Sequence, residues 1–297
     1  MSNPPRGVTS WDMNRTLALL LGLAPLALWA LPPPALAQSG AGPATPRTEA
    51  TTVDADYAFY TAGLNTGDLS TAIDLSPSGY RVKFNFHTAG LFGAFIHGQN
   101  ETVVEGRWQG SDAVPERYDS VGLWSGQKWE TAIDYADLEP FTRVLTPPRE
   151  PDRDPVTPAQ ARQTLDSLSA MALLVRRVQL TGSCDGTARL FDGRRLMELT
   201  AHTVGNEDVP RSSRSPYWGT AQRCDFEGLL IGGFEHDKEE SSTRRPKRGS
   251  AWFAVIAPGA PPMPIRMDFE TLWFGTASMY LTAFHPQKSA LVAGAPR

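Results

Sequence analysis

The segment Thr181–His202, "TGSCDGTARLFDGRRLMELTAH", gathers residue types that readily do chemistry. It holds Cys184, the pair Asp192-Gly193 and the double arginine Arg194-Arg195. A thiolate beside cationic side chains could act as a nucleophile or redox centre, and paired arginines could bind an anion. The same residues could instead be structural, as one end of a disulfide, a bend in a strand and two surface charges. The remaining sequence favours the structural interpretation.

The chain has two cysteines, Cys184 and Cys224. A redox centre usually needs a Cys-x-x-Cys pair or a site that stabilises a thiolate, and neither is evident. In an oxidising compartment an even number of cysteines indicates pairing, and two cysteines allow one connectivity. We therefore predict a structural Cys184–Cys224 disulfide.

Two interpretations of Asp192-Gly193 remain open. The pair could form a two-residue hairpin turn, which would tend to carry Cys184 away from Cys224. It could instead be a bulge in one strand running from Thr187 to His202, with the turn in "TVGNEDVP" at 203–210. Because the second arrangement brings the two cysteines opposite each other, the bulge is slightly favoured.

Signatures of catalysis are missing from the sequence. The text closest to a Gly-x-Ser-x-Gly nucleophile elbow is "GLWSG" at 122–126, which has the wrong spacing. No Gly-rich phosphate loop follows a strand, and the histidines are too scattered to suggest zinc. We therefore expect a non-enzymatic protein with no catalytic residue, no metal site and no cofactor. The histidines are His87, His97, His202, His236 and His285.

Residues 1–37 resemble an export signal, with Arg15 before an apolar core and a small-x-small cleavage site ending at Ala37. A transmembrane anchor is the weaker alternative, because Pro25 and the prolines at 32–34 interrupt the apolar run. The start of translation, at Met1 or Met13, stays open. We expect a periplasmic protein, cleaved after Ala37, with no transmembrane anchor in the mature chain. A net charge of −4 gives no reason to expect a nucleic-acid partner.

Elements that could position a site are mainly strands. The segments 80–87, 128–135 and 264–271 alternate apolar and polar residues, as half-buried antiparallel strands do. One segment differs: Thr157, Pro158 and Gln160 form a capping box, and apolar residues then recur at helical spacing. The sequence predicts a helix at about 158–178, interrupted near Asp166, that covers the concave face of a sheet.

The predicted organisation is a flexible leader at 38–52, a single β-rich domain at 53–286 and a tail at 287–297. Residues 234–250 are a mixed-charge loop, either solvated or a docking surface. The aromatic side chains on the strands could line an apolar cavity or be ordinary core. The candidates for such a lining are Phe84, Phe86, Trp124, Trp129, Tyr135 and Phe269.

An ordered set of segments resembles the bacterial envelope family DUF3108, a domain of unknown function. The segments are "AFYTAGLNTGDL" (58–69), "TAGLFG" (88–93), "DSLSAMALL" (166–174), "FDGRR" (191–195), "YWGTAQRC" (217–224) and "PIRMDFETLWFG" (264–275). The resemblance implies a periplasmic protein with an open, curved antiparallel sheet similar to the LolA and LolB lipoprotein carriers. It implies no established activity and no catalytic residues.

These observations support a binding or scaffolding protein of the cell envelope. The partner expected first is a lipid or another apolar ligand held by the curved sheet. The alternatives are a purely structural module that binds an envelope protein, and a hydrolase without a recognisable motif.

Overall fold

The structure is a computed structural model, and it describes residues 51–148, 153–236, 245–270 and 276–287. They belong to one compact unit, Arg47–Arg297. The predicted signal peptide and nearly all of the predicted leader lie outside the described residues. So do the middle of the mixed-charge loop and almost all of the predicted tail.

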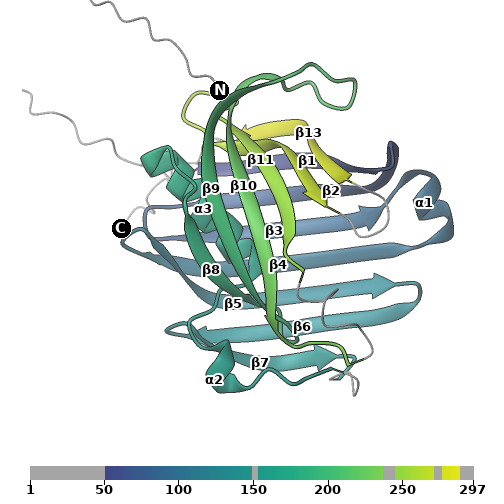
Figure 1. Ribbon diagram of the computed structural model, residues 1–297, viewed down its shortest axis with the longest axis vertical. Coiled ribbons are helices and arrows are strands. Elements are labelled where there is room, and N and C mark those ends of the chain that lie inside the picture. The colour runs from purple at the N-terminus through teal and green to yellow at the C-terminus, as the bar shows by residue number, and fades with distance from the viewer. Residues whose placement is uncertain (1–50, 149–152, 237–244, 271–275, 288–297) are drawn as a thin grey trace, which may run out of the picture. The chain divides into compact units, whose positions relative to one another are not determined.

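The described residues form one antiparallel sheet of thirteen strands (Figure 1). The strand order is β7-β6-β5-β4-β3-β2-β1-β13-β12-β11-β10-β9-β8, so β7 and β8 are the two edges. The first and last strands, β1 and β13, pair in the middle of the sheet. The strands are β1 (Thr51–Thr61), β2 (Leu64–Leu75), β3 (Gly79–Thr88), β4 (Gly98–Gln109), β5 (Asp112–Trp124), β6 (Gln127–Ala136), β7 (Glu139–Thr146), β8 (Gly186–Phe191), β9 (Leu196–Val209), β10 (Gly219–Gly232), β11 (Lys247–Ala254), β12 (Met263–Glu270) and β13 (Thr276–Gln287).

Alternation along the strands produces two distinct faces. In β3, Tyr80 and Val82 are buried while Arg81 and His87 are exposed, as the sequence pattern predicted. We call the side on which the main helix packs the inner face and the other side the outer face. The prediction of a mainly β protein with a single curved antiparallel sheet packed on one main helix is confirmed.

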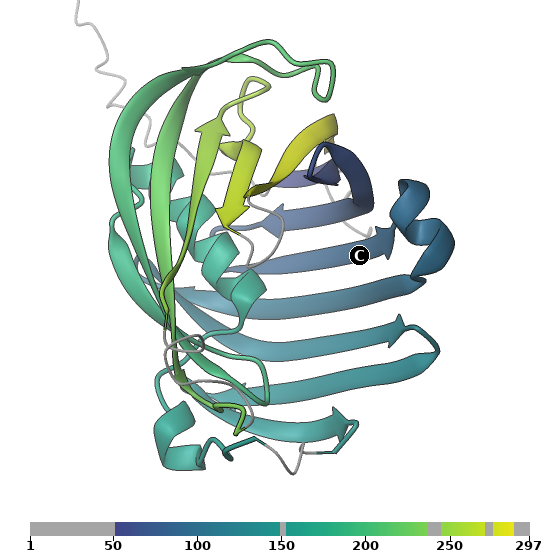
Figure 2. The ribbon, with the colours of Figure 1, turned by 45° about the vertical axis from the view of Figure 1, so that its right-hand side comes forward.

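The predicted helical segment forms two helices, α2 (Pro158–Ala161) and α3 (Ser167–Thr181). Thr157 and Gln160 cap α2 reciprocally, as the capping box predicted. The break falls where expected, because Asp166 takes an extended conformation and accepts hydrogen bonds from the first turn of α3. α3 lies against β3, β4 and β5 on one side and β8 on the other, so the coiled sheet wraps around it (Figure 2).

The inner face carries the main core. Val175 of α3, Val53 of β1, Val104 of β4 and Leu281 of β13 are all almost fully inaccessible to solvent. These residues come from distant parts of the chain, so burial of their apolar surface is what holds the coil of the sheet around α3. A third, short helix, α1 (Gly90–Phe95), connects β3 to β4 and packs on β2.

The segment between α2 and α3 pairs with the edge strand β8 and also contacts the turn that precedes β7. Gln163 N–H donates to the carbonyl of Leu138, in the turn next to β7, at 2.9 Å. Leu165 exchanges two backbone hydrogen bonds with β8, one to the carbonyl of Arg189 and one from the N–H of Phe191. Edge strands otherwise present free backbone groups to other chains, so these bonds guard against edge-to-edge association.

The slightly favoured bulge at Asp192-Gly193 is wrong, because the structure has a hairpin between β8 and β9 there. Asp192 organises the turn: its carboxylate accepts hydrogen bonds from the N–H groups of Arg194 and Arg195. The predicted turn at 203–210 is also misplaced, because β9 continues to Val209.

Cys184 and Cys224 nevertheless form a disulfide, with their Cα atoms 6.2 Å apart. The hairpin does not separate them, because Cys184 precedes β8 and lies outside its ladder. Side chains place it there: Cys184 N–H donates to Thr203 Oγ1 at 2.9 Å, and Thr203 N–H donates to Asp185 Oδ1 at 2.7 Å. Thr203 is the cross-strand partner of Cys224. Both cysteines are fully buried, so the segment after Thr181 has a structural role and is not a reactive site.

Candidate functional site

The inner face beyond α3 carries a patch that combines aromatic rings with hydrogen-bonded polar groups. Cross-strand pairing places Phe86, Asn100, Gly122 and Trp129 side by side on β3, β4, β5 and β6. Trp124, at the end of β5, is paired with Gly98 in the next row. We call Phe86, Asn100, Thr102, Ser120, Trp124 and Trp129 the inner patch.

Glycines give the rings room to lie against the sheet. A Cβ added to Gly98 would come within 2.4 Å of the Trp124 ring, and one added to Gly67 would come within 2.5 Å of the Phe86 ring. Both rings therefore cover backbone, not side chains. Phe86 also packs edge-on against Phe59, with ring centroids 5.8 Å apart. Trp124 remains 45% exposed, so the patch presents accessible aromatic surface.

Three polar side chains form a closed network in the centre of the patch. Asn100 Nδ2 donates to Thr102 Oγ1 at 3.1 Å, and Ser120 Oγ donates to Asn100 Oδ1 at 3.1 Å. The hydroxyls of Thr102 and Ser120 are 2.9 Å apart. The network leaves a polar strip between Phe86 on one side and Trp129 on the other. Such a surface can hold an amphiphile with both apolar and polar parts.

Arg194 brings a positive charge to the same region. Its guanidinium lies 5.1 Å from the centre of the Trp129 ring and donates to Thr131 Oγ1 at 3.3 Å. It also donates to the carbonyl of Pro147. Arg194 and Arg195 therefore do not act as a pair: Arg194 lies against Trp129, whereas Arg195 forms an ion pair with Asp192 in the turn.

The six residues predicted as an apolar lining are only partly brought together. Phe84, Phe86, Trp124 and Trp129 share the inner face of β3, β5 and β6. Tyr135 lies further along β6 and is buried in a separate core cluster. Phe269 lies on β12, where it lines a different hollow of about 330 Å³ with Arg223 and Arg248.

Sequence reasoning missed the polar members of the patch, Asn100, Thr102 and Ser120. A signal was available: in the alternation of β4 and β5 they occupy inward-facing positions. A hydroxyl or amide at an inward position needs a partner, so several on neighbouring strands indicate a buried network. The strand pairing that shows them to be neighbours was not known from the sequence.

A buried acidic group lies at the start of α3. Asp166 is fully buried and accepts hydrogen bonds from Leu168 N–H, Ser169 N–H and the Ser169 hydroxyl. Burial raises the pKa of this carboxyl from its usual value to about 6. Burial also raises the pKa of the neighbouring hydroxyls of Tyr80 and Tyr135 far above their usual value. These tyrosines therefore stay neutral and are not candidates for proton transfer near pH 7.

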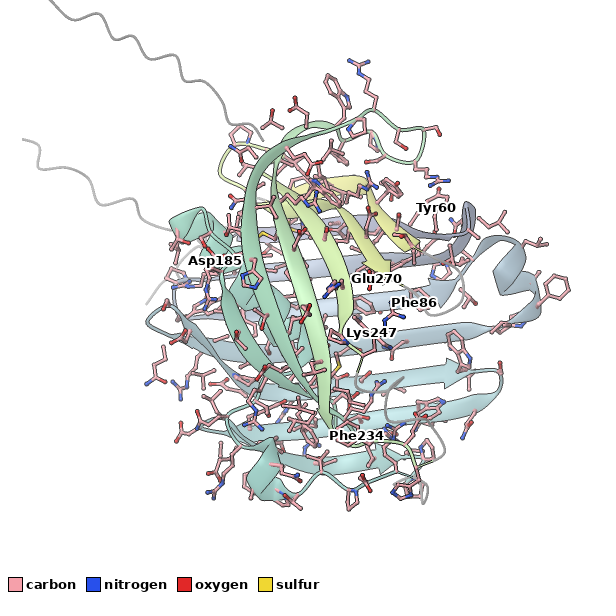
Figure 3. The ribbon with its side chains drawn as sticks, in the orientation of Figure 1. Tyr60, Phe86, Asp185, Phe234, Lys247 and Glu270 are labelled. Atoms are coloured by element: carbon pink, nitrogen blue, oxygen red, sulfur yellow. A yellow bond between two sulfur atoms is a disulfide. The ribbon has the colours of Figure 1, made fainter. Side chains whose placement is uncertain are left out.

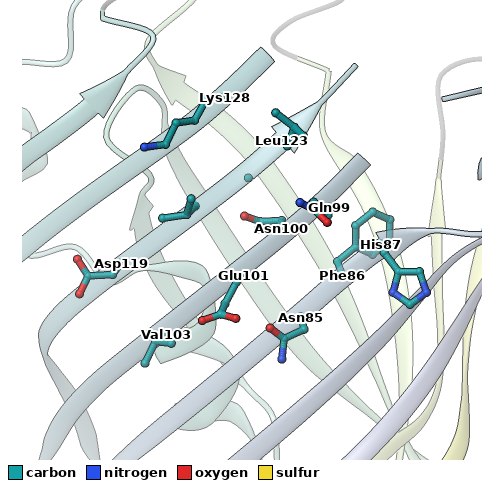
Figure 4. Close-up of a pocket in the computed structure, with 12 residues that line it drawn as sticks. Asn85, Phe86, His87, Gln99, Asn100, Glu101, Val103, Asp119, Leu123 and Lys128 are labelled. Atoms are coloured by element: carbon teal, nitrogen blue, oxygen red, sulfur yellow. The ribbon is translucent and has the colours of Figure 1, made fainter. Parts of the chain in front are cut away.

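The outer face has a hollow of about 860 Å³ over β3 to β6 (Figure 4). Its lining mixes charged side chains of both signs, such as Glu101, Asp119 and Lys128, with the apolar side chains of Val103, Val121 and Leu123. His87 lies 3.7 Å from Asp68 at one end. The arrangement has no activated nucleophile, and no group of three or more metal-binding side chains occurs among the described residues.

A coiled, open antiparallel sheet around one helix, with a partly exposed aromatic patch on its inner side, defines a class of half-barrel proteins. Within that class, the chain belongs to the DUF3108 family, described as a protein of unknown function, whose model matches residues 54–282. The resemblance inferred from the sequence is therefore confirmed.

Similar solved structures include the following two. A β-barrel-like protein of domain family DUF1849 from Brucella abortus is 12% identical, with a TM-score of 0.50 over 81% of this chain and 100% of that chain. A putative exported protein with a YmcC-like fold from Bacteroides fragilis is 14% identical, with a TM-score of 0.31 over 78% of this chain and 95% of that chain. The first similarity supports the fold. The search of curated proteins found no match.

One observation bears on location. The disulfide fits an extracytoplasmic compartment, where oxidising conditions allow such bonds to persist. Among the described residues, no helix has the length and apolar character needed to cross a membrane.

Proposed function

We propose that this protein is a non-enzymatic periplasmic envelope protein that binds a long-chain amphiphile, such as a fatty acid or the acyl part of a lipid, on the inner patch. The observation that supports this most is the set of rings at Phe86, Trp124 and Trp129, which flank a hydrogen-bonded polar strip on the inner face. A fully packed core would have no accessible ring, whereas Trp124 is 45% exposed.

The arrangement suits an amphiphile better than a purely apolar ligand. An acyl chain would lie against the rings and gain roughly 0.8 kcal/mol for each methylene that it buries. The carboxylate or another polar end would lie near Asn100, Ser120 or the guanidinium of Arg194. A wholly apolar ligand would leave that strip without water, which costs free energy.

Quenching of tryptophan fluorescence by a brominated long-chain fatty acid tests the proposal, because bromine quenches only nearby rings. We expect saturable quenching below the critical micelle concentration. Trp129→Ala should weaken binding roughly tenfold, since a large apolar contact is lost. Phe141→Ala is the matched control, because that ring is 59% exposed and lies outside the patch.

Native mass spectrometry provides a second readout. Protein purified without detergent should carry a lipid-sized adduct that Trp129→Ala reduces. A clean unliganded mass, together with no saturable quenching, would rule out acyl binding. Co-purification of an envelope protein under the same conditions would favour the scaffold alternative.

A further inference from the structure

Exposed apolar side chains gather at one end of the sheet. Phe95 and Leu91 of α1 are 79% and 65% exposed, and Leu64 beside the β1–β2 turn is 57% exposed. Contact between large apolar side chains and water is unfavourable, so a group of exposed ones indicates an interaction surface. The segment 88–100 around α1 contains no Asp, Glu, Lys or Arg.

Backbone contacts show that α1 and the β1–β2 turn are neighbours. Ala89 N–H donates to the carbonyl of Thr66 at 3.3 Å. A Cβ added to Gly90 would come within 2.5 Å of the carbonyl oxygen of Asn65. Leu64 and the exposed residues of α1 therefore belong to one surface.

The tip of the β9–β10 hairpin adds two arginines to this surface. Arg214 lies 4.5 Å from the centre of the Tyr60 ring and donates to the carbonyl of Gly63 at 3.5 Å (Tyr60 is labelled in Figure 3). Arg211 lies 3.9 Å from the centre of the Trp218 ring, which is 54% exposed. Both views place the hairpin tip and α1 on the same side (Figures 1 and 2).

These two arginines differ from several arginines elsewhere on the sheet in having no carboxylate partner among the described residues. Arg81, Arg107 and Arg143 on the outer face each pair with a carboxylate. Among the described residues, Arg211 and Arg214 have aromatic rings and a carbonyl as neighbours and no carboxylate within ion-pair distance. Their positive charge is therefore available to an anionic partner. We call Leu64, Leu91, Phe95, Arg211, Arg214 and Trp218 the rim.

We propose that the rim docks on the surface of an anionic phospholipid bilayer, with the apolar side chains entering the interface and the arginines contacting lipid phosphates. Exposed Leu and Phe side chains partition into the interface, arginines gain from the negative surface potential, and Trp favours the headgroup level. A protein partner would need carboxylates placed against two particular guanidinium groups, whereas anionic headgroups are mobile and meet both.

Docking would also bring the inner patch to the bilayer. α1 leads directly into Gly98, whose backbone the Trp124 ring covers. The end of the patch nearest Trp124 is therefore next to the rim. Docking does not depend on acyl binding, so the two proposals can fail separately.

Flotation with lipid vesicles tests the docking. The folded protein, stripped of bound lipid, should float with vesicles containing phosphatidylglycerol at low salt and not with vesicles of phosphatidylcholine alone. Leu91→Ser combined with Phe95→Ser should lower the partition coefficient roughly tenfold or more. Arg211→Gln combined with Arg214→Gln should lower it roughly fivefold for each arginine, with a weaker dependence on salt.

Matched controls separate docking from general effects. Phe141→Ser removes an exposed ring, 59% accessible, from β7, and Arg81→Gln removes one positive charge from β3. Both should float like the unmodified protein. Quenching by the brominated fatty acid should be unchanged in the Leu91 and Phe95 variant.

Three results would overturn the docking proposal. They are a protein that does not float with anionic vesicles at low salt, rim variants that float as well as the controls, and a dimer in solution that dissociates when Leu91 and Phe95 are replaced. The last result would identify the rim as a contact between two copies of the chain.

Discussion

Replacing Cys184 and Cys224 together by alanine should lower the free energy of unfolding by about 4 kcal/mol. The disulfide joins residues 40 positions apart, and a cross-link of that span removes considerable conformational freedom from the unfolded chain. Alanine is the appropriate replacement, because both sites are fully buried and a serine hydroxyl there would need a new partner. Urea denaturation of the oxidised protein and of the double variant measures the difference.

The location of the disulfide adds a local effect. The loop it closes includes β8, β9 and the start of β10, so the bond ties one edge of the sheet to its interior. Hydrogen exchange in β8 should therefore increase more than in β3 when the bond is removed. A loss below about 1 kcal/mol, with uniform exchange, would show that the side-chain contacts of Thr203 and Asp185 hold this corner without the disulfide.

Asp166 should make stability depend on pH in a particular direction. Its pKa is about 6 in the folded protein and 3.8 in the unfolded reference, so the folded state holds the proton more tightly. The resulting stability is fully present below about pH 3.8 and is lost as the pH rises through 6. The full difference corresponds to about 3 kcal/mol, and about 1 kcal/mol of it should appear between pH 7 and pH 5.

The matched variant is Asp166→Asn, which keeps an oxygen to accept from Leu168 and Ser169 but does not titrate. The free energy of unfolding of the original protein minus that of the variant should rise as the pH falls from 7 to 5. Taking this difference cancels the contributions of all other carboxylates. A difference that stays constant over this range would show that water reaches Asp166 and that its pKa is near normal.

Much of the fold could be predicted from single segments. The alternation at 80–87, 128–135 and 264–271 corresponds to β3, β6 and β12, and the capping box of Thr157 corresponds to the start of α2. These patterns depend only on contacts between residues close in the sequence and on each strand having one buried and one solvent-facing side. The break before α3 was predicted on the same local basis.

The errors arose where distant segments decide the structure. Asp192-Gly193 suits both a turn and a bulge, and the choice depended on where Cys184 would lie relative to Thr203, which is a tertiary contact. Which aromatic residues form the candidate site was hard to predict for the same reason. Phe269 and Trp129 share a residue class and an alternating pattern, but the strand order places them far apart, on β12 and β6, and Phe269 lines a hollow of its own. The rim combines three segments, and no local pattern connects Phe95 with Arg211.

The pairing of β1 with β13 has a consequence for the order of assembly. Strands β1 to β7 and β8 to β13 can each form as a sequence of neighbouring hairpins, with contacts close in the chain. The two halves can join only after β13 has emerged, and this closure spans more than 200 residues, Thr52 to Gln287. Such non-local pairing is slow. Until it occurs, β1 presents one unpaired edge, and the other is β12 before β13 is added and β13 afterwards. A chain shortened before β13 should therefore aggregate, and a cell producing this protein would need to shield both edges during its synthesis.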